Sequence, residues 1–255
     1  MRYPAALGRG TLIRRYKRFL ADVELEDGTT VTMHCPNTGA MTSCDVPGSV
    51  VWYSTSANPK RKYRHTWELI EIDGHLISIN SARANAVVGE ALEAGSIEAL
   101  AGYGSIRREV RVGDSRLDFV LGDHAGDSRT CLVEVKSVTL LHDPQEGAGS
   151  FPDAVSARAA RHLGHLTDLA GSHRCVLLFC VQHAGIRSVR AAREVDPEWA
   201  YALDRAIGAG VEVRAYLARP TPEGSHLGPP VPVVAGIVEH EGQLNFLKAN
   251  GCDEV

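Results

Sequence analysis

The stretch CLVEVKSVTL (residues 131–140) has the pattern of a short, largely apolar β-strand. Successive side chains of a strand point to opposite faces, so Cys131, Val133 and Val135 share one face, and Leu132, Glu134 and Lys136 share the other. A carboxylate and an ammonium group therefore lie next to each other on an otherwise apolar strand. Such a pair needs an explanation, because a buried charge is costly unless it is paired or bound to an ion.

Two further strands are expected just before this one, at residues 107–113 and 116–121, and each carries polar residues in one row. Glu109 and Arg111 alternate with valines in the first, and Arg116 and Asp118 alternate with apolar residues in the second. If the three strands are neighbours, Glu109, Asp118, Glu134 and Lys136 converge on one face of the sheet.

Two carboxylates on rigid strands are suitable ligands for Mg²⁺ or Mn²⁺. We expect Asp118 and Glu134 to hold the ion, with the Val135 carbonyl as a further oxygen ligand. Lys136 would orient water or stabilise charge on a phosphate, and Glu109 would be an additional acid. The structural alternative is a salt bridge, either Glu134–Lys136 or Asp118–Arg116.

The pattern of elements predicts two domains, at residues 1–80 and 81–255. The first contains short strands and two Asp-Gly hairpin turns, at 27–28 and 73–74, which favour a small barrel or sandwich. The second alternates helices, expected at 81–95, about 154–170 and 198–209, with strands that include 175–181 and 211–217. This order indicates an α/β domain with a mixed sheet, and GIVEH (236–240) adds a short strand near the end.

Three local details follow from the same patterns. Ser81 is expected to cap the first helix and Gly95 to end it. Val155 is expected on the apolar face of the second helix, together with its leucines. In the tight turn HCPNTGAM (34–41), Asn37 and Gly39 fit positions with positive φ.

Charge is distributed unevenly along the chain, although the net charge is only -4. Residues 1–65 hold ten Lys/Arg and five Asp/Glu, whereas the rest holds 17 and 26. RRYKRF (14–19) and PKRKYRHTW (59–67) both mix cations with aromatic rings, a combination that suits the backbone and bases of a nucleic acid. The alternative is a pair of solvated strand edges. The expected nucleic-acid contacts are Arg14, Arg15, Lys17, Arg18, Lys60, Arg61, Lys62, Arg64, Arg158 and His162.

Arg158, His162 and His165 lie on one face of the helix expected at 154–170, where they could contact a phosphate backbone. A zinc site at His162 and His165 is a weaker interpretation, because no third ligand has the right spacing. The six cysteines form no CxxC pair. We find neither a signal peptide nor an apolar run of about 20 residues, and we expect a soluble, cytoplasmic protein with no membrane partner.

The chain resembles the sugar fermentation stimulation protein A family. The stretches that carry the resemblance are RYKRFLADVEL (15–25), HCPNTGAM, PKRKYRHTWEL (59–69), REVRVGDSRLDFVL (108–121), VEVKSVTL (133–140), FPDAVSARAARHL (151–163) and VLLFCVQH (176–183). The resemblance implies an OB-fold-like domain followed by a PD-(D/E)XK nuclease-like domain, DNA binding, and a link to the regulation of sugar-fermentation genes.

In the family's motif, Asp118 matches the aspartate, and Glu134 and Lys136 match E-x-K. Leu117 stands where the motif has proline, and Ala159, next to the expected DNA contact Arg158, stands where the family has glycine.

Two functions stay open at this point: a Mg²⁺-dependent nuclease that binds DNA, or a DNA-binding regulator of sugar-metabolism genes with a vestigial nuclease site. The expected partner is single- or double-stranded DNA, bound with little sequence specificity. RNA is a third, weaker alternative, because OB-type folds bind either nucleic acid. A homodimer is also left open.

Overall fold

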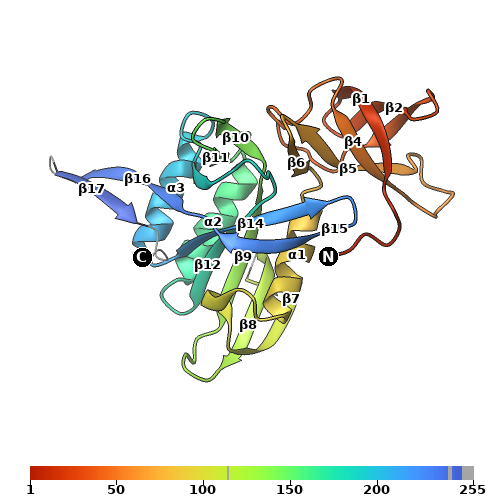
Figure 1. Cartoon of the computed structure of the whole chain (residues 1–255). Helices are drawn as coiled ribbons and strands as arrows, with labels where there is room; N and C mark the ends of the chain where they lie inside the picture. Colours follow the sequence, from red (N-terminus) through yellow and green to blue (C-terminus); the bar gives the residue numbers. More distant parts are fainter. Residues whose placement is uncertain (114, 241–242, 249–255) are drawn as a thin grey trace.

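A computed structural model of the chain describes residues 1–113, 115–240 and 243–248 (Figure 1). Its first part is a closed β-barrel. The strands of this part are β1 (Gly8–Tyr16), β2 (Leu20–Leu25), β3 (Thr30–His34), β4 (Val50–Thr55), β5 (His65–Ile72) and β6 (His75–Ser78). They pair in the order β3-β2-β1-β4-β5-β6, and a further pairing of His34 with Thr66 joins β3 to β5 and closes the barrel.

The barrel forms where the alternating sequence predicts it. Both Asp-Gly pairs are hairpin turns, with Gly28 and Gly74 at positive φ. Trp67, Met33 and Ile70 are fully buried in the barrel core. The prediction for HCPNTGAM is wrong in detail, because the positive φ values in this region belong to Met41 and Ser43, not to Asn37 and Gly39.

The second part is built on a mixed six-stranded sheet, as the sequence predicts. The sheet has the order β15-β14-β12-β9-β8-β7. Its strands are β7 (Tyr103–Val112), β8 (Ser115–His124), β9 (Cys131–Val138), β12 (Arg174–Val181), β14 (Glu212–Thr221) and β15 (Gly224–Pro230). The pairs β9–β12 and β12–β14 are parallel, and the remaining pairs are antiparallel.

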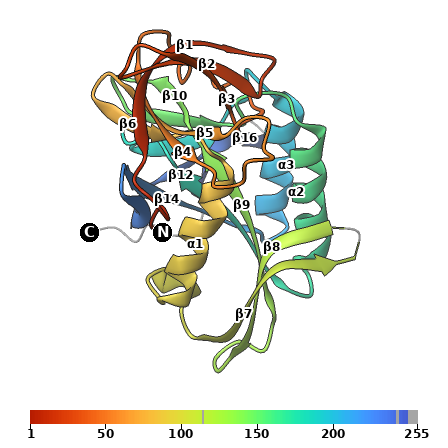
Figure 2. The same cartoon turned by 90° about the vertical axis from the view of Figure 1, so that its right-hand side faces the viewer.

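Helices cover both faces of this sheet (Figure 2). α1 (Ala82–Glu93) packs on one face, followed by the short 3-10 helix η1 (Glu98–Leu100). α2 (Ala157–Leu169) and α3 (Pro197–Gly208) pack on the other. Both faces of the central strands are therefore buried, which explains the continuous apolar run in β12.

The helix ends differ from the sequence predictions at two points. Gly95 has φ +65 and follows α1 as expected, but the Ser81 side chain makes no capping hydrogen bond. Val155 precedes α2 and is 75% exposed, so it does not belong to the apolar face. α2 begins after Val155, and Ser156 caps it by accepting a hydrogen bond from the Ala159 amide.

A second sheet, mostly absent from the prediction, has the order β10-β11-β13-β16-β17. Its strands are β10 (Leu140–Asp143), β11 (Ala148–Phe151), β13 (Ser188–Ala191), β16 (Val233–His240) and β17 (Gln243–Lys248). The strand expected at GIVEH is part of β16. None of the described helices is both long and apolar enough to cross a membrane.

The two parts contact each other at several places. The first residues of the chain reach the second part, where the Met1 amino group contacts the Ser225 carbonyl at 2.6 Å and the Tyr3 amide donates to the Glu223 carbonyl. Glu68 of β5 is fully buried and accepts two hydrogen bonds from Arg83 of α1, at 2.7 and 3.0 Å. The Glu68–Arg83 hydrogen bonds fix α1 against the barrel.

Candidate functional site

The candidate site lies where strands β8 and β9 separate. Their ladder ends at the pair Phe119–Val133, and Asp118 is the adjacent, unpaired residue of β8. There the Asp118 carboxylate accepts a hydrogen bond from the Val135 amide at 2.8 Å. Its other oxygen accepts one from Asn85 of α1 at 2.6 Å. No pattern in the sequence pointed to Asn85, because its role depends on how α1 packs against the sheet.

The separation also changes the face that β8 presents. Leu117 packs in the core under α2, whereas Phe119 packs in the core under α1. Strict alternation would place both residues on one face, so the simple two-row prediction for this strand is wrong. Asp118 lies between them and reaches both α1 and β9.

Glu134 is the buried carboxylate of the site, with 3% of its surface exposed. Its Oε1 atom accepts hydrogen bonds from Lys136 Nζ at 2.7 Å and from His162 Nδ1 at 2.6 Å. Its Oε2 atom has no hydrogen-bond partner among the described residues. One oxygen is therefore fixed in position, and the other is buried without a hydrogen-bond partner in the described part of the chain.

The two carboxylates differ in their electrostatics. Burial, and then the charge of Glu134, raise the pKa of Asp118 to about 6. Burial also acts to raise the pKa of Glu134, but the hydrogen bonds and charges of His162 and Lys136 outweigh it and leave the pKa below its usual value. A cation placed between the two carboxylates would relieve their repulsion.

The residues of this pair fit a divalent ion that keeps several waters. Asp118, Glu134 and the Val135 carbonyl would be the protein ligands, and the unpartnered Glu134 Oε2 supports this assignment. Across the described ranges, no group of three or more His, Cys, Asp or Glu is placed to hold a metal. Mg²⁺ is usually bound by one or two carboxylates and several waters, whereas structural zinc needs four protein ligands.

Glu109 faces solvent at the edge of the site. Its φ is +55, and its side chain is 48% exposed and paired with Arg116 at 2.8 Å. Of the two predicted salt bridges, Glu134–Lys136 is present. Arg116 pairs with Glu109 and not with Asp118.

A cavity of about 600 Å³ surrounds the two carboxylates. We call it the main cavity. The barrel contributes Arg18 and residues 37–39 to its wall, and the second part contributes Glu109, Arg158 and His162 among others. Gly39 packs directly on the Asp153 carboxylate, which accepts a hydrogen bond from the Met41 amide at 3.1 Å. Barrel and α/β domain thus build the cavity together.

A basic groove of about 520 Å³ continues along α2. It shares Arg116, Arg158 and His162 with the main cavity and adds Arg161 and His165. His162 bonds Glu134, so it is a partner of the carboxylate as well as a groove residue. Ala159 is buried in the core, whereas its neighbour Arg158 lies on the wall of the main cavity.

The two basic stretches of the barrel lie at one edge. β2 pairs with β3 at Leu20–His34, and β3 pairs with β5 at His34–Thr66. The turn at 17–19 and the loop at 56–64 therefore both lie next to the His34 end of β3. Lys60, Arg61, Lys62 and Arg64 are exposed in that loop, and Arg14, Lys17 and Arg18 are exposed near the turn.

Arg15 has a different position from the other cations. Its side chain is 7% exposed and donates hydrogen bonds to the carbonyls of Arg18, Asn37, Gly39 and Ala40. It therefore holds the barrel wall of the main cavity together, and we propose no DNA contact for it.

Comparison with known proteins identifies the family. Residues 13–79 match the family described as "SfsA N-terminal OB domain", and residues 82–224 match the "Sugar fermentation stimulation protein RE domain". The chain belongs to the sugar fermentation stimulation protein family. The predicted fold class, an OB-like barrel followed by an α/β domain with a mixed sheet, is thereby confirmed.

Relatives in this family match nearly their whole length. The "Sugar fermentation stimulation protein homolog" of Shewanella sp. (strain MR-7) is 54% identical over 237 residues, which cover 91% of this chain and 99% of the relative. The homolog of Shewanella loihica is 53% identical and covers 88% and 96%. A solved structure, "The structure of Pyrococcus Furiosus SfsA in complex with Ca2+", has a TM-score of 0.79 at 26% identity and covers 91% of this chain and 97% of that one.

Proposed function

We propose that this sugar fermentation stimulation protein binds DNA and hydrolyses its phosphodiester bonds with the help of Mg²⁺ or Mn²⁺. The observation that carries the proposal is the buried Glu134, with Oε1 held by Lys136 and His162, Oε2 unpartnered, and Asp118 beside it where the strands separate. The Pyrococcus furiosus relative forms a complex with Ca²⁺, another divalent ion that prefers oxygen ligands.

Each residue of the site has a proposed role. Asp118 and Glu134, with the Val135 carbonyl, would hold the ion, which when bound supplies a Lewis acid and lowers the pKa of a bound water. Lys136 would orient the attacking water and stabilise charge on the phosphate. Glu109 would act at the exposed rim as an additional acid, and Arg158 would bind a phosphate oxygen.

The surface that leads to the main cavity supports DNA as the partner. Arg18, Arg116 and Arg158 line the cavity, and the exposed cations of the 56–64 loop lie at the same barrel edge as the turn at 17–19. A cavity with two anionic groups at its base would repel a polyanion without these cations. The residues that line the cavity favour contacts to the backbone and therefore little sequence specificity.

One observation favours the alternative, a DNA-binding regulator with no turnover. The Glu134–Lys136 contact at 2.7 Å together with His162 already neutralises the buried carboxylate, as a purely structural ion pair would. In that case the protein would bind DNA and the acidic pair would only stabilise the fold.

Metal-dependent cleavage separates the two functions. Labelled single- and double-stranded DNA is incubated with the protein in Mg²⁺, Mn²⁺ or EDTA, beside Asp118→Ala and Glu134→Ala, and binding is measured in the same tubes. A matched RNA oligomer tests the choice of nucleic acid. Cleavage that needs the ion and both carboxylates establishes the nuclease. Binding without cleavage in any metal establishes the regulator.

A further inference from the structure

The turn between β1 and β2 is held in an unusual conformation. Lys17 and Arg18 have φ values of +50 and +65, a region that residues other than glycine rarely occupy. Arg15 stabilises this turn by donating two hydrogen bonds to the Arg18 carbonyl and by bonding the carbonyls of the 37–40 segment. A strained backbone that a buried arginine holds in place indicates a segment whose exact position matters.

The turn presents a cation and an aromatic ring together. Arg18 lines the main cavity, and the next residue, Phe19, is 47% exposed. The other ring of this stretch, Tyr16, is already engaged, because its hydroxyl donates to Asp22 at 3.0 Å and the Arg14 guanidinium lies 5.0 Å from its centre. Phe19 is therefore the ring of RRYKRF that is exposed to solvent.

We infer that Phe19 is a stacking platform for an unpaired base, and that the strand entering the main cavity is single-stranded there. This inference rests on the proposed function and adds the substrate class. In a duplex the base faces are stacked inside, and only the backbone and the base edges in the grooves are accessible. A ring can therefore stack only on a base that has left the helix. Stacking of this kind tolerates any sequence.

The fixed turn explains how base and phosphate are handled together. Arg15 joins the turn to residues 37–40, and Gly39 of that segment packs on Asp153 of the α/β domain. Phe19 is thus held in a fixed relation to the wall that surrounds Asp118 and Glu134. A base stacked on Phe19 would place its own backbone next to Arg18, at the entrance to the site.

Binding measured without divalent ions tests this inference independently of cleavage. The probes are a labelled oligothymidylate of about 12 nucleotides, within the site size of one OB-type fold, and a hairpin duplex of matched length. The variants are Phe19→Leu, which keeps an apolar side chain, and Phe19→Tyr, which keeps the ring. Ile13→Ala, at an exposed apolar position of β1, is the control.

We expect Phe19→Leu to weaken binding of the single strand roughly 5- to 150-fold, the range for losing one base–aromatic stack, while duplex binding stays the same. Phe19→Tyr and Ile13→Ala should bind like the wild type. An unchanged affinity of Phe19→Leu for the single strand, or an equal loss on both probes, overturns the inference. If the wild type binds neither probe, it is the proposed function that fails.

Discussion

The Asp118 carboxylate accepts a hydrogen bond from the Val135 amide at 2.8 Å, just beyond Phe119–Val133, the last paired position of strands β8 and β9. The side chain thereby replaces a ladder hydrogen bond that the separated strands no longer make. It also brings the two carboxylates of the site together in a buried position, which raises the pKa of Asp118 to about 6. Both carboxylates line the main cavity beside this separation.

Lys136 should affect turnover more than metal binding. Lys136→Met removes the ammonium but leaves Asp118 and Glu134 in place, with His162 still bonded to Glu134. We expect the cleavage rate to fall about 10²- to 10³-fold, with Mn²⁺ affinity within about threefold of the wild type. Lys60→Met, on the exposed barrel loop, is the control for loss of a positive charge. An equal loss of Mn²⁺ affinity would mean that Lys136 only supports Glu134.

The histidine pair between barrel and α/β domain should make stability sensitive to acid. His183 is 3% exposed and its ring lies 5.8 Å from that of His75. Burial, followed by the charge of His75, lowers the pKa of His183 from 6.5 to about 4. The folded state therefore favours the neutral ring, and its contribution is complete above pH 6.5 and is lost as the pH falls towards 4.

Urea unfolding between pH 7 and 4 measures this effect. We expect His183→Asn, whose amide oxygen can replace Nδ1 as acceptor for the Gly185 amide, to lose up to about 3 kcal/mol less than the wild type across this range. The exposed His226→Asn should follow the wild-type curve. Parallel curves for all three proteins would contradict the assignment to His183.

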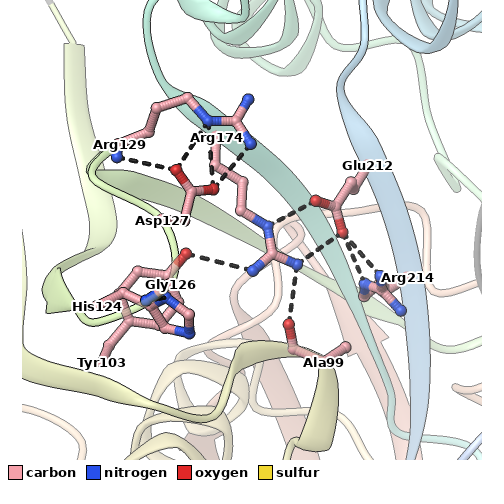
Figure 3. A network of polar contacts seen from close by, with 9 residues as sticks. All are labelled: Ala99, Tyr103, His124, Gly126, Asp127, Arg129, Arg174, Glu212 and Arg214. Atoms are coloured by element: carbon pink, nitrogen blue, oxygen red, sulfur yellow. Dashed lines mark hydrogen bonds and ion pairs between the residues drawn. The ribbon is translucent and has the colours of Figure 1, made fainter.

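Arg174 should contribute to stability without affecting the site. Its guanidinium donates hydrogen bonds to Glu212 at 2.6 Å, to the Ala99 carbonyl at 2.8 Å and to the Tyr103 hydroxyl at 3.2 Å, and Figure 3 shows these contacts. Since both partners of the ion pair are only 18% exposed, Arg174→Ala should reduce the free energy of unfolding by about 2–3 kcal/mol. Arg129→Ala, which breaks a surface pair in the same network, should cause no measurable change.

Arg174→Ala also tests whether this network affects cleavage at the candidate site. Arg174 joins η1, β7 and β14 through its three partners, and none of these atoms lines the main cavity. Cleavage by Arg174→Ala at a temperature where it is folded should therefore equal that of the wild type. A loss of cleavage by folded Arg174→Ala would show coupling to the site that the contacts do not predict.

Gly39 should be required for the contact of Asp153 with the barrel segment 37–41. A Cβ at this position would meet the Asp153 carboxylate, so Gly39→Ala should displace it from the Met41 amide at a cost of about 1 kcal/mol. In an Asp153→Ala background the same substitution should cost little, and a double-mutant cycle of unfolding energies measures the difference. Gly171→Ala, with nothing within 4 Å of the added Cβ, is the control. Additive costs would contradict the contact.

Much of the fold follows from local pattern. The Asp-Gly turns, the apolar run of β12 and the alternation in β9 are set by neighbouring residues, and each formed the element that was predicted. The short strands β10, β11 and β13 were missed, because four-residue strands carry little periodicity. Val155 was misplaced because α2 begins only after the Ser156 cap.

The site was predictable in composition but not in geometry. Asp118, Glu134 and Lys136 stood out because charges on apolar strands need partners. Glu109 was expected beside them, but its positive φ turns it to the exposed rim. The contacts of Asn85, Arg15 and Gly39 depend on packing between distant segments, about which a single sequence contains no periodic signal.

Mn²⁺ binding by the purified protein, measured by electron paramagnetic resonance, tests the proposed metal site most directly. The measurement is made at pH 8, above the pKa of about 6 for Asp118. We predict a site in the wild type that Asp118→Ala and Glu134→Ala each weaken at least tenfold, while Glu93→Ala, at the C-terminal end of α1, leaves it unchanged. Equal Mn²⁺ affinity in wild type and Asp118→Ala would contradict the metal site on which the proposed nuclease depends.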